Sequence, residues 1–172
     1  MASGAFRFAI AFFAMVFSAS CGKERNQFTI LDAAAVYESD RAVFASIRTV
    51  YPGPYQDFTR IPNRNPEEET RFDRDFFRQL RDQIPVEFID FFPIGSTGAD
   101  EINVVLKRYQ HGDTWNTVSL IYFGMELTLS DEHGDMRMFK DCDEKALAWV
   151  ETPPRAAFCR LNSNWYAFQR VE

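Results

Sequence analysis

Both histidines of the chain stand in the tripeptide His-Gly-Asp, at His111–Asp113 and His133–Asp135. An imidazole and a carboxylate two positions apart can orient each other for acid–base chemistry. The same tripeptide is typical of a tight turn, because glycine permits turn backbone and aspartate accepts local backbone hydrogen bonds. A single strand over residues 115–130 would separate the two turns to its opposite ends. The turn interpretation is therefore favoured, and no catalytic residue is assigned.

Acidic side chains gather around and after the second tripeptide. Carboxylate oxygens bind Ca²⁺, but the spacing here is not that of an EF-hand loop. The sequence also lacks nucleophile-elbow, zinc-ligand and dinucleotide-binding patterns. We expect no metal site and no cofactor, and enzymatic activity is the less favoured class of function. The acidic residues are Asp131, Glu132, Asp135, Asp141, Asp143 and Glu144.

An unbroken apolar run, Phe8–Phe17, follows a single basic residue, Arg7. The run is too short for a membrane-spanning helix, which takes about 20 residues, but it has the length of a signal-peptide core, about 7–15 residues. Small residues and then Cys21-Gly22 come next. The chain is therefore expected to be exported, with residues 1–20 as its signal peptide.

The order of these features, most specifically over Phe17–Gly22, resembles the leader of bacterial lipoproteins. The resemblance implies that Cys21 is acylated and becomes the new amino terminus, which anchors the chain on the periplasmic face of a bacterial membrane. Ser18 stands where that family usually has leucine. An ordinary secretory cleavage, giving a periplasmic or secreted protein, stays open as the alternative.

The three cysteines of the chain are consistent with this leader. If Cys21 carries lipid, Cys142 and Cys159 remain, and an oxidising compartment favours a disulfide between them. Closing a loop of this length would stabilise the fold by about 3 kcal/mol. Two buried free thiols are the alternative.

Removal of Arg7 with the leader takes the net charge from −6 to −7. An acidic protein is a poor match for phosphate backbones, so nucleic acid is not an expected partner. The chain contains 18 phenylalanines, and aromatic side chains bury large areas, so a compact core is feasible. We expect a tether over residues 21–28 and one globular domain over residues 29–172.

Two stretches have the apolar spacing of helices. Residues 31–51 carry Val36, Phe44 and Ile47 on one face and end at Pro52-Gly53-Pro54, with Asp32 as a cap. The second predicted helix starts with Asn65 as N-cap and Pro66 at its first position, and it ends before Pro85.

The second helix has one apolar and one charged face. The apolar stripe predicts core packing, while the charged face, with the pairs Glu67–Arg71 and Arg78–Asp82, is interpreted as solvated surface. The stripe consists of Phe72, Phe76, Phe77, Leu80 and Ile84.

From Glu101 onward the apolar period changes to two, which predicts strands. A long strand from Trp115 needs a bulge or bend at Gly124 to keep one apolar face, because the pattern changes parity there. A hairpin over residues 156–171 closes the chain. Residues 86–92 and 146–150 stay ambiguous between a strand and a turn.

The expected fold is α+β, with two amino-terminal helices packed on one face of a curved antiparallel sheet of four to six strands. The favoured function is a membrane-anchored envelope lipoprotein that binds or assembles with an envelope protein partner. The first alternative is a binder of an apolar small molecule in a cavity between helices and sheet. The second is a small hydrolase or isomerase that uses His111 or His133.

Overall fold

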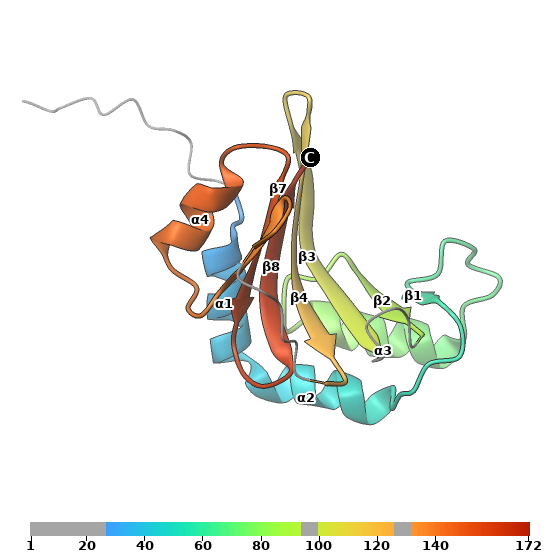
Figure 1. The fold of residues 1–172 in the computed structure, drawn as a ribbon. Coiled ribbons are helices and arrows are strands. Elements are labelled where there is room, and N and C mark those ends of the chain that lie inside the picture. The colour runs from blue at the N-terminus through green and yellow to red at the C-terminus, as the bar shows by residue number, and fades with distance from the viewer. Residues whose placement is uncertain (1–26, 94–99, 126–131) are drawn as a thin grey trace, which may run out of the picture.

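A computed structural model describes residues 27–93, 100–125 and 132–172. The sheet of these residues has eight strands, and four helices accompany it (Figure 1). The elements are α1 (Ile30–Ser39), α2 (Arg41–Val50), β1 (Thr59–Ile61), α3 (Arg71–Arg81), β2 (Phe88–Phe92), β3 (Glu101–His111), β4 (Thr114–Phe123), β5 (Glu132–His133), β6 (Met136–Phe139), α4 (Glu144–Val150), β7 (Arg155–Arg160) and β8 (Trp165–Val171).

The strands lie in the order β1-β2-β3-β4-β8-β7-β6-β5. Neighbouring strands are antiparallel except β6 and β7, which are parallel. The parallel pair follows from its connection, because the chain crosses from β6 to β7 through α4 instead of turning back in a hairpin. The α+β class is confirmed, but the prediction of a purely antiparallel sheet of four to six strands is wrong.

Three helices, and not two, precede β2 within the described residues. The predicted helix over residues 31–51 is two helices that meet at Asp40, whose backbone leaves the helical region. Thr29, and not Asp32, is the N-cap of α1, and Asp32 completes the capping box by accepting from the Thr29 N–H at 2.7 Å. The break lets α1 and α2 follow the twisted sheet, each burying its own apolar face.

The helix predicted from Asn65 begins later, at Arg71. Asn65 does form the expected turn with Glu68, whose carboxylate accepts from the Asn65 side chain at 2.8 Å, but the helix does not continue from there. Thr70 is the N-cap and accepts from the Asp73 N–H at 3.1 Å. Phe72 was expected in the core but is 61 % exposed, because it lies in the first turn, beyond the region that packs on the sheet.

One face of the sheet packs against the helices. Along β3, Ile102 and Val104 point to that face and are fully buried, whereas Glu101 and Asn103 point to the other face. Aromatic rings tie the helices to the strands, since Trp165 of β8 lies within ring-contact distance of Tyr37, Phe44 and Tyr122. The same buried cluster includes Ile30, Ile47, Phe77, Leu80, Leu120, Ala146 and Val150.

The region around Gly124 differs from the predicted bulge. Strand β4 ends at Phe123, and the register shift of the sheet lies in β3 between Val105 and Lys107. The remainder of the predicted long strand, residues 126–131, lies outside the described residues. Gly124 instead approaches Asp100, and its N–H donates to the Asp100 carbonyl at 2.9 Å.

Asp100 is held between two glycines. A Cβ atom at Gly53 or at Gly124 would lie 2.0 Å from a carboxylate oxygen of Asp100. The same carboxylate pairs with Arg48 of α2, with 2.8 Å between Nη1 and Oδ2. Glycine is therefore required at both positions for the close approach.

Gly124→Ala and Gly53→Ala are each expected to destabilise the fold by about 1–3 kcal/mol, because the new methyl group displaces the buried carboxylate. Urea unfolding measures the change. In an Asp100→Ala background the carboxylate is gone, so the cost of Gly124→Ala falls, and the cost of Gly53→Ala falls in part, because a Cβ atom there would still lie 2.6 Å from Arg48 Nη1. If the glycine substitutions lowered the free energy of unfolding equally in both backgrounds, the role assigned to Asp100 would be wrong.

Candidate functional site

The packing of α3 fixes where its charged residues lie. Phe77 and Leu80 are buried. The Tyr51 hydroxyl donates to Asp73 Oδ1 at 2.5 Å, which fastens the first turn to the end of α2. Arg74, Arg78 and Arg81 each follow one of these residues by one position, so they form a stripe about 100° around the helix from the packed side, at helical spacings of four and three.

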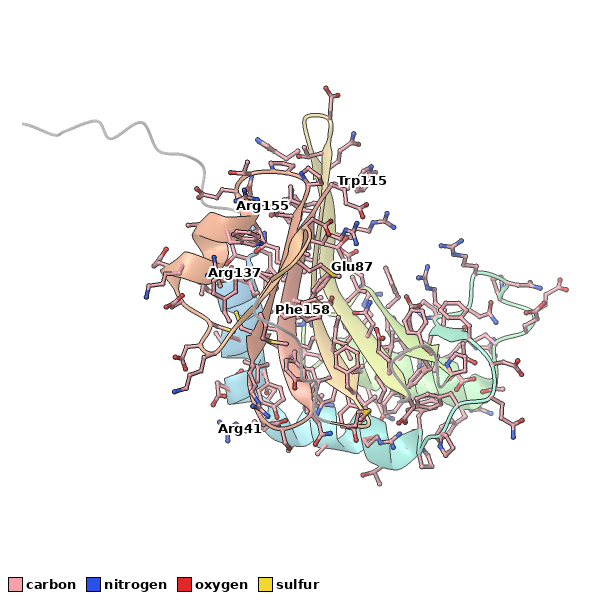
Figure 2. The ribbon with its side chains drawn as sticks, in the orientation of Figure 1. Arg41, Glu87, Trp115, Arg137, Arg155 and Phe158 are labelled. Atoms are coloured by element: carbon pink, nitrogen blue, oxygen red, sulfur yellow. The ribbon has the colours of Figure 1, made fainter. Side chains whose placement is uncertain are left out.

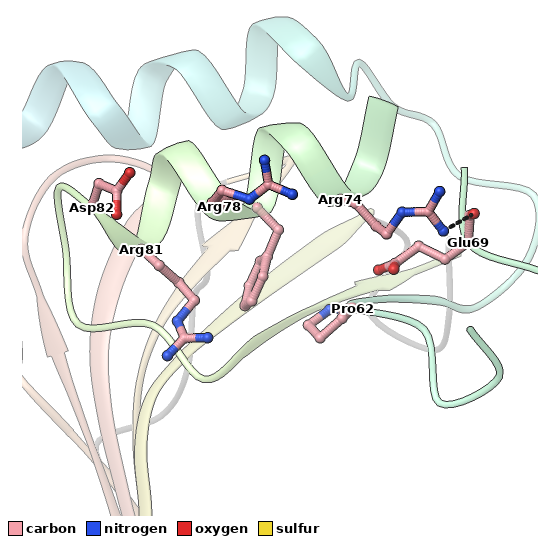
Figure 3. Close-up of a pocket in the computed structure, with 7 residues that line it drawn as sticks. Pro62, Glu69, Arg74, Arg78, Arg81 and Asp82 are labelled. Atoms are coloured by element: carbon pink, nitrogen blue, oxygen red, sulfur yellow. Dashed lines mark hydrogen bonds between the residues drawn. The ribbon is translucent and has the colours of Figure 1, made fainter. Parts of the chain in front are cut away.

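These three arginines line a groove of about 350 Å³ beside α3. Figure 3 shows them along the helix, with Glu69 beside Arg74 at the start of the helix and Pro62 across from the helix. Arg74 Nη1 donates to the Glu69 carbonyl at 3.2 Å. Phe77 supplies an aromatic surface in the groove, and Asp82 completes the lining. The groove therefore combines three guanidinium groups with two carboxylates and two apolar side chains.

The arginines of the groove are weakly neutralised. Arg78 Nη1 lies 3.4 Å from Asp75 Oδ1, and the Arg78 side chain is 73 % exposed and that of Asp75 44 %. Within the described part of the chain, Arg74 and Arg81 have no ion-pair partner. Planar guanidinium groups bind carboxylates and phosphates through paired hydrogen bonds, so the groove suits an anionic ligand with an apolar part.

A second groove of about 240 Å³ adjoins the first, and Arg81 lines both. Its other charged residues are Glu87 and Lys107, whose carboxylate oxygen and ammonium nitrogen lie 3.4 Å apart. The apolar part of its lining consists of Ile84, Pro85, Val86 and Leu106.

Sequence reasoning missed the groove. It interpreted the charged face of this helix as solvated surface and paired Arg71 with Glu67 and Arg78 with Asp82. Both arginines instead flank Asp75. The missed signal is the arginine repeat at positions 71, 74, 78 and 81 in a chain of net charge −6. The loop at Pro62 faces these arginines only in the tertiary structure, so no sequence pattern could show it.

A buried polar row crosses the sheet on the face away from the helices. Arg60, Asp90 and Asn103 are cross-strand neighbours on β1, β2 and β3. Arg60 binds Asp90 through two hydrogen bonds of 2.5 and 2.6 Å, and its guanidinium lies 4.1 Å from the Phe88 ring centroid. Asp90 is only 4 % exposed. A charge this deeply buried is held by its bidentate partner.

Glu101 lies beside this row. Burial raises the pKa of Glu101 from its ordinary value of 4.5 to about 7, and the Asp90 carboxylate adds to the shift. The Asn103 side-chain oxygen and the buried Ser119 hydroxyl on the same face have no hydrogen-bond partner. The arrangement combines one ion-paired carboxylate with one that takes up a proton near neutral pH.

The two histidines lie at hairpin turns, as the turn interpretation predicted. Gly112 and Gly134 have φ values of 60° and 65°, in the left-handed region that glycine adopts readily, and each lies in the tight connection that follows its histidine. The His111 side chain is exposed, and its Nδ1 lies 3.3 Å from Gln27 Nε2. His111 is thus bonded to the start of the described chain, and no carboxylate among the described residues pairs with it.

The expectation that the turns lie at opposite ends of one strand is wrong, because β4 ends at Phe123 and the sheet register places the starts of β4 and β6 at the same end. The register connects Thr117 of β4 to Arg170, Ala156 and Met136 on successive strands. Both turns therefore lie toward the same end of the sheet. His111 belongs to β3 and His133 to β5, which are five strand spacings apart, about 24 Å along the sheet, so the two turns are not neighbours.

Cys142 and Cys159 are adjacent but unbonded. They lie 2.8 Å apart, compared with about 2.05 Å for a disulfide, and both are free thiols. The predicted disulfide is therefore wrong for this structure. The hydrogen bond to Cys142, followed by burial, raises the pKa of the Cys159 thiol. A buried protonated thiol behaves as a small apolar side chain.

The acidic segment does not assemble into a metal site in the part of the chain that is described. No group of three or more histidine, cysteine, aspartate or glutamate side chains is placed there to hold a metal ion. Asp143 caps α4 by accepting from the Lys145 and Ala146 N–H groups. Asp135 Oδ2 lies 3.8 Å from Arg170 Nη2, so this carboxylate is paired with an arginine. Asp131 lies outside the described residues.

Cys21 and the rest of the leader also lie outside the described residues. Among the helices that are described, none has the length and apolar character to cross a membrane. No family model, no curated protein and no solved structure matches the chain.

The titration of Glu101 predicts the pH dependence of stability. The folded state holds a proton between pH 4.5 and about 7 that the unfolded state releases, so the free energy of unfolding falls as pH rises through this range. The loss is on the order of 3 kcal/mol and is complete above about pH 7.

Glu101→Gln removes this slope and makes the protein more stable than the wild type at pH 8, as urea unfolding at several pH values will measure. The exposed Glu67→Gln is the control and keeps the wild-type profile. A Glu101→Gln profile that follows the wild type would contradict this assignment.

Proposed function

We propose that this chain is a membrane-anchored binding module of the bacterial envelope, which takes an acidic segment of a partner protein into the groove beside α3. Export through residues 1–20 and acylation of Cys21 supply the anchor. The observation that carries the binding proposal is that Arg74, Arg78 and Arg81 line one groove, where only Arg78 has an ion-pair partner among the described residues, Asp75 at 3.4 Å.

The chemistry of the groove favours a peptide over a simple ion. Phe77 and Pro62 offer apolar surface between the charges, so a segment that alternates acidic and apolar side chains meets both kinds of lining. From Arg74 to Arg81 the helix rises about 10 Å, the length of about three extended residues. A short acidic stretch is thus sufficient to reach all three guanidinium groups.

The two alternative functions have less support. A cavity for an apolar ligand should be lined mainly by apolar side chains, whereas charged residues predominate in the groove. Acid–base catalysis at His111 or His133 needs an oriented histidine in a cleft, and His111 is an exposed turn residue bonded to Gln27. A binding role without catalysis is therefore the better-supported class.

Reversing one groove charge should weaken binding of an acidic peptide. With a fluorescein-labelled peptide of alternating glutamate and leucine, Arg81→Glu and Arg74→Glu should each raise Kd about tenfold at low salt, since an attraction is replaced by a repulsion. Fluorescence anisotropy measures Kd, and far-UV circular dichroism confirms that each variant folds.

Arg71→Glu is the matched control, because Arg71 has the same charge on the same helix, is 90 % exposed and does not line the groove. An equal loss of affinity in Arg71→Glu would mean that the peptide responds to the net charge of the protein and does not bind in the groove. Tight binding of a lysine–leucine peptide, or displacement of the acidic peptide by a single-stranded oligonucleotide, would also overturn the proposed ligand class.

The anchor is tested separately. Cells expressing the full chain and fed a palmitate analogue should label the protein, and Cys21→Ala should abolish both the label and recovery with membranes. Cys142→Ala is the control that keeps the label. If the wild-type protein were unlabelled and recovered in the soluble fraction, the proposed anchor would be wrong and ordinary secretion would be the explanation.

A further inference from the structure

The start of the described chain lies at one end of the sheet, beside the β3–β4 hairpin. The Tyr109 hydroxyl donates to the Phe28 carbonyl at 3.2 Å, and Gln27 contacts His111. Phe28 is half-buried against the main core, which fixes this entry point. Gln27, the first described residue, therefore lies at the hairpin end.

The hairpin end also carries an exposed tryptophan. Trp115, at the start of β4, is 42 % exposed, and the Arg108 guanidinium lies 5.0 Å from its ring. Its backbone is fixed, because its N–H donates to the Glu172 carbonyl and its carbonyl accepts from the Glu172 N–H, both at 2.9 Å. Trp165 is buried, and Trp149 is partly covered by Arg137 and Arg155.

We propose that the β3–β4 hairpin end rests on the membrane surface, with Trp115 in the lipid interface, Arg108 at the headgroup phosphates and the groove beside α3 turned away from the bilayer. Figure 1 shows the hairpin and α3 at opposite ends of the molecule, and Figure 2 places Trp115 near the hairpin. This orientation rests on the anchor at Cys21 proposed above.

The tether makes this contact geometrically possible. Cys21 precedes Gln27 by six positions, so even a fully extended link holds the hairpin end within about 20 Å of the acylated residue. The aromatic ring of tryptophan is favoured in the interfacial layer, and an arginine beside it can reach phosphate oxygens.

The same end carries acidic groups that limit the strength of the contact. Asp113 in the hairpin turn and Glu172 at the chain end are exposed, and Asp32 lies near Tyr109. They repel an anionic surface and oppose Arg108. One tryptophan under these conditions gives a weak contact, so the domain should meet the membrane only when the tether raises its local concentration.

The experiment uses the full chain purified from bacterial membranes and reconstituted on vesicles of phosphatidylethanolamine and phosphatidylglycerol, with and without brominated acyl chains. On vesicles without bromine the wild-type tryptophan emission should shift to the blue, and brominated lipid should quench the part of it that comes from Trp115. Trp115→Phe should remove both effects. A reporter at the far end, Phe72→Trp in the Trp115→Phe background, should not be quenched.

Quenching of the Phe72→Trp reporter, or equal quenching of the wild type and Trp115→Phe, would overturn the orientation. If the wild-type protein does not float with the vesicles, the proposed lipid anchor at Cys21 is wrong. The mature chain with a histidine tag ahead of Cys21, held on chelator-lipid vesicles, then still tests the orientation by the same reporters. Binding of the untagged mature chain to plain vesicles would contradict the need for a tether.

Discussion

The ion pair between Arg48 and Asp100 joins the parts of this fold that are far apart in sequence. Arg48 lies on α2, and Asp100 immediately precedes β3. The Arg48 guanidinium also donates to the Tyr55 hydroxyl at 3.2 Å and lies 5.1 Å from the Tyr122 ring centroid on β4. Gly53 and Gly124 leave room for the carboxylate. The pair thus sets how α2 meets the long strands, and leaving either charge without its partner would cost several kcal/mol.

The position of α2 in turn determines the surface of α3. Tyr51, the residue that follows α2, contacts the Phe76 and Phe91 rings and donates to Asp73. These contacts hold α3 by its apolar side. Because the apolar side of α3 is packed in this way, its arginines lie along the edge of the helix that faces the loop at Pro62. The groove is a consequence of core packing, and its charges remain available because only Arg78 of the three arginines has an ion-pair partner among the described residues.

The two faces of the sheet carry different kinds of residue. The helix-covered face is apolar and includes the two cysteines, whose thiols lie together without a bond. The other face combines an apolar cluster around Tyr166 and Phe158 with the buried Arg60–Asp90 pair and the readily protonated Glu101. In the proposed function the binding groove, the polar row and the tethered hairpin end are separate regions, so each can be changed without disturbing the others.

The sequence by itself determined the local features whose cause lies within a few residues. The α+β class, the turns at Gly112 and Gly134 and the closing hairpin follow from periodicity and glycine chemistry. The break at Asp40, the late start of α3 at Arg71 and the parallel pairing of β6 with β7 do not, because they depend on which surfaces are available to pack. Strands as short as β1 and β5 leave no periodic signal at all. The groove and the Asp100 contacts were decided only by tertiary structure, since their members come together across the chain and share no spacing that a sequence pattern can show.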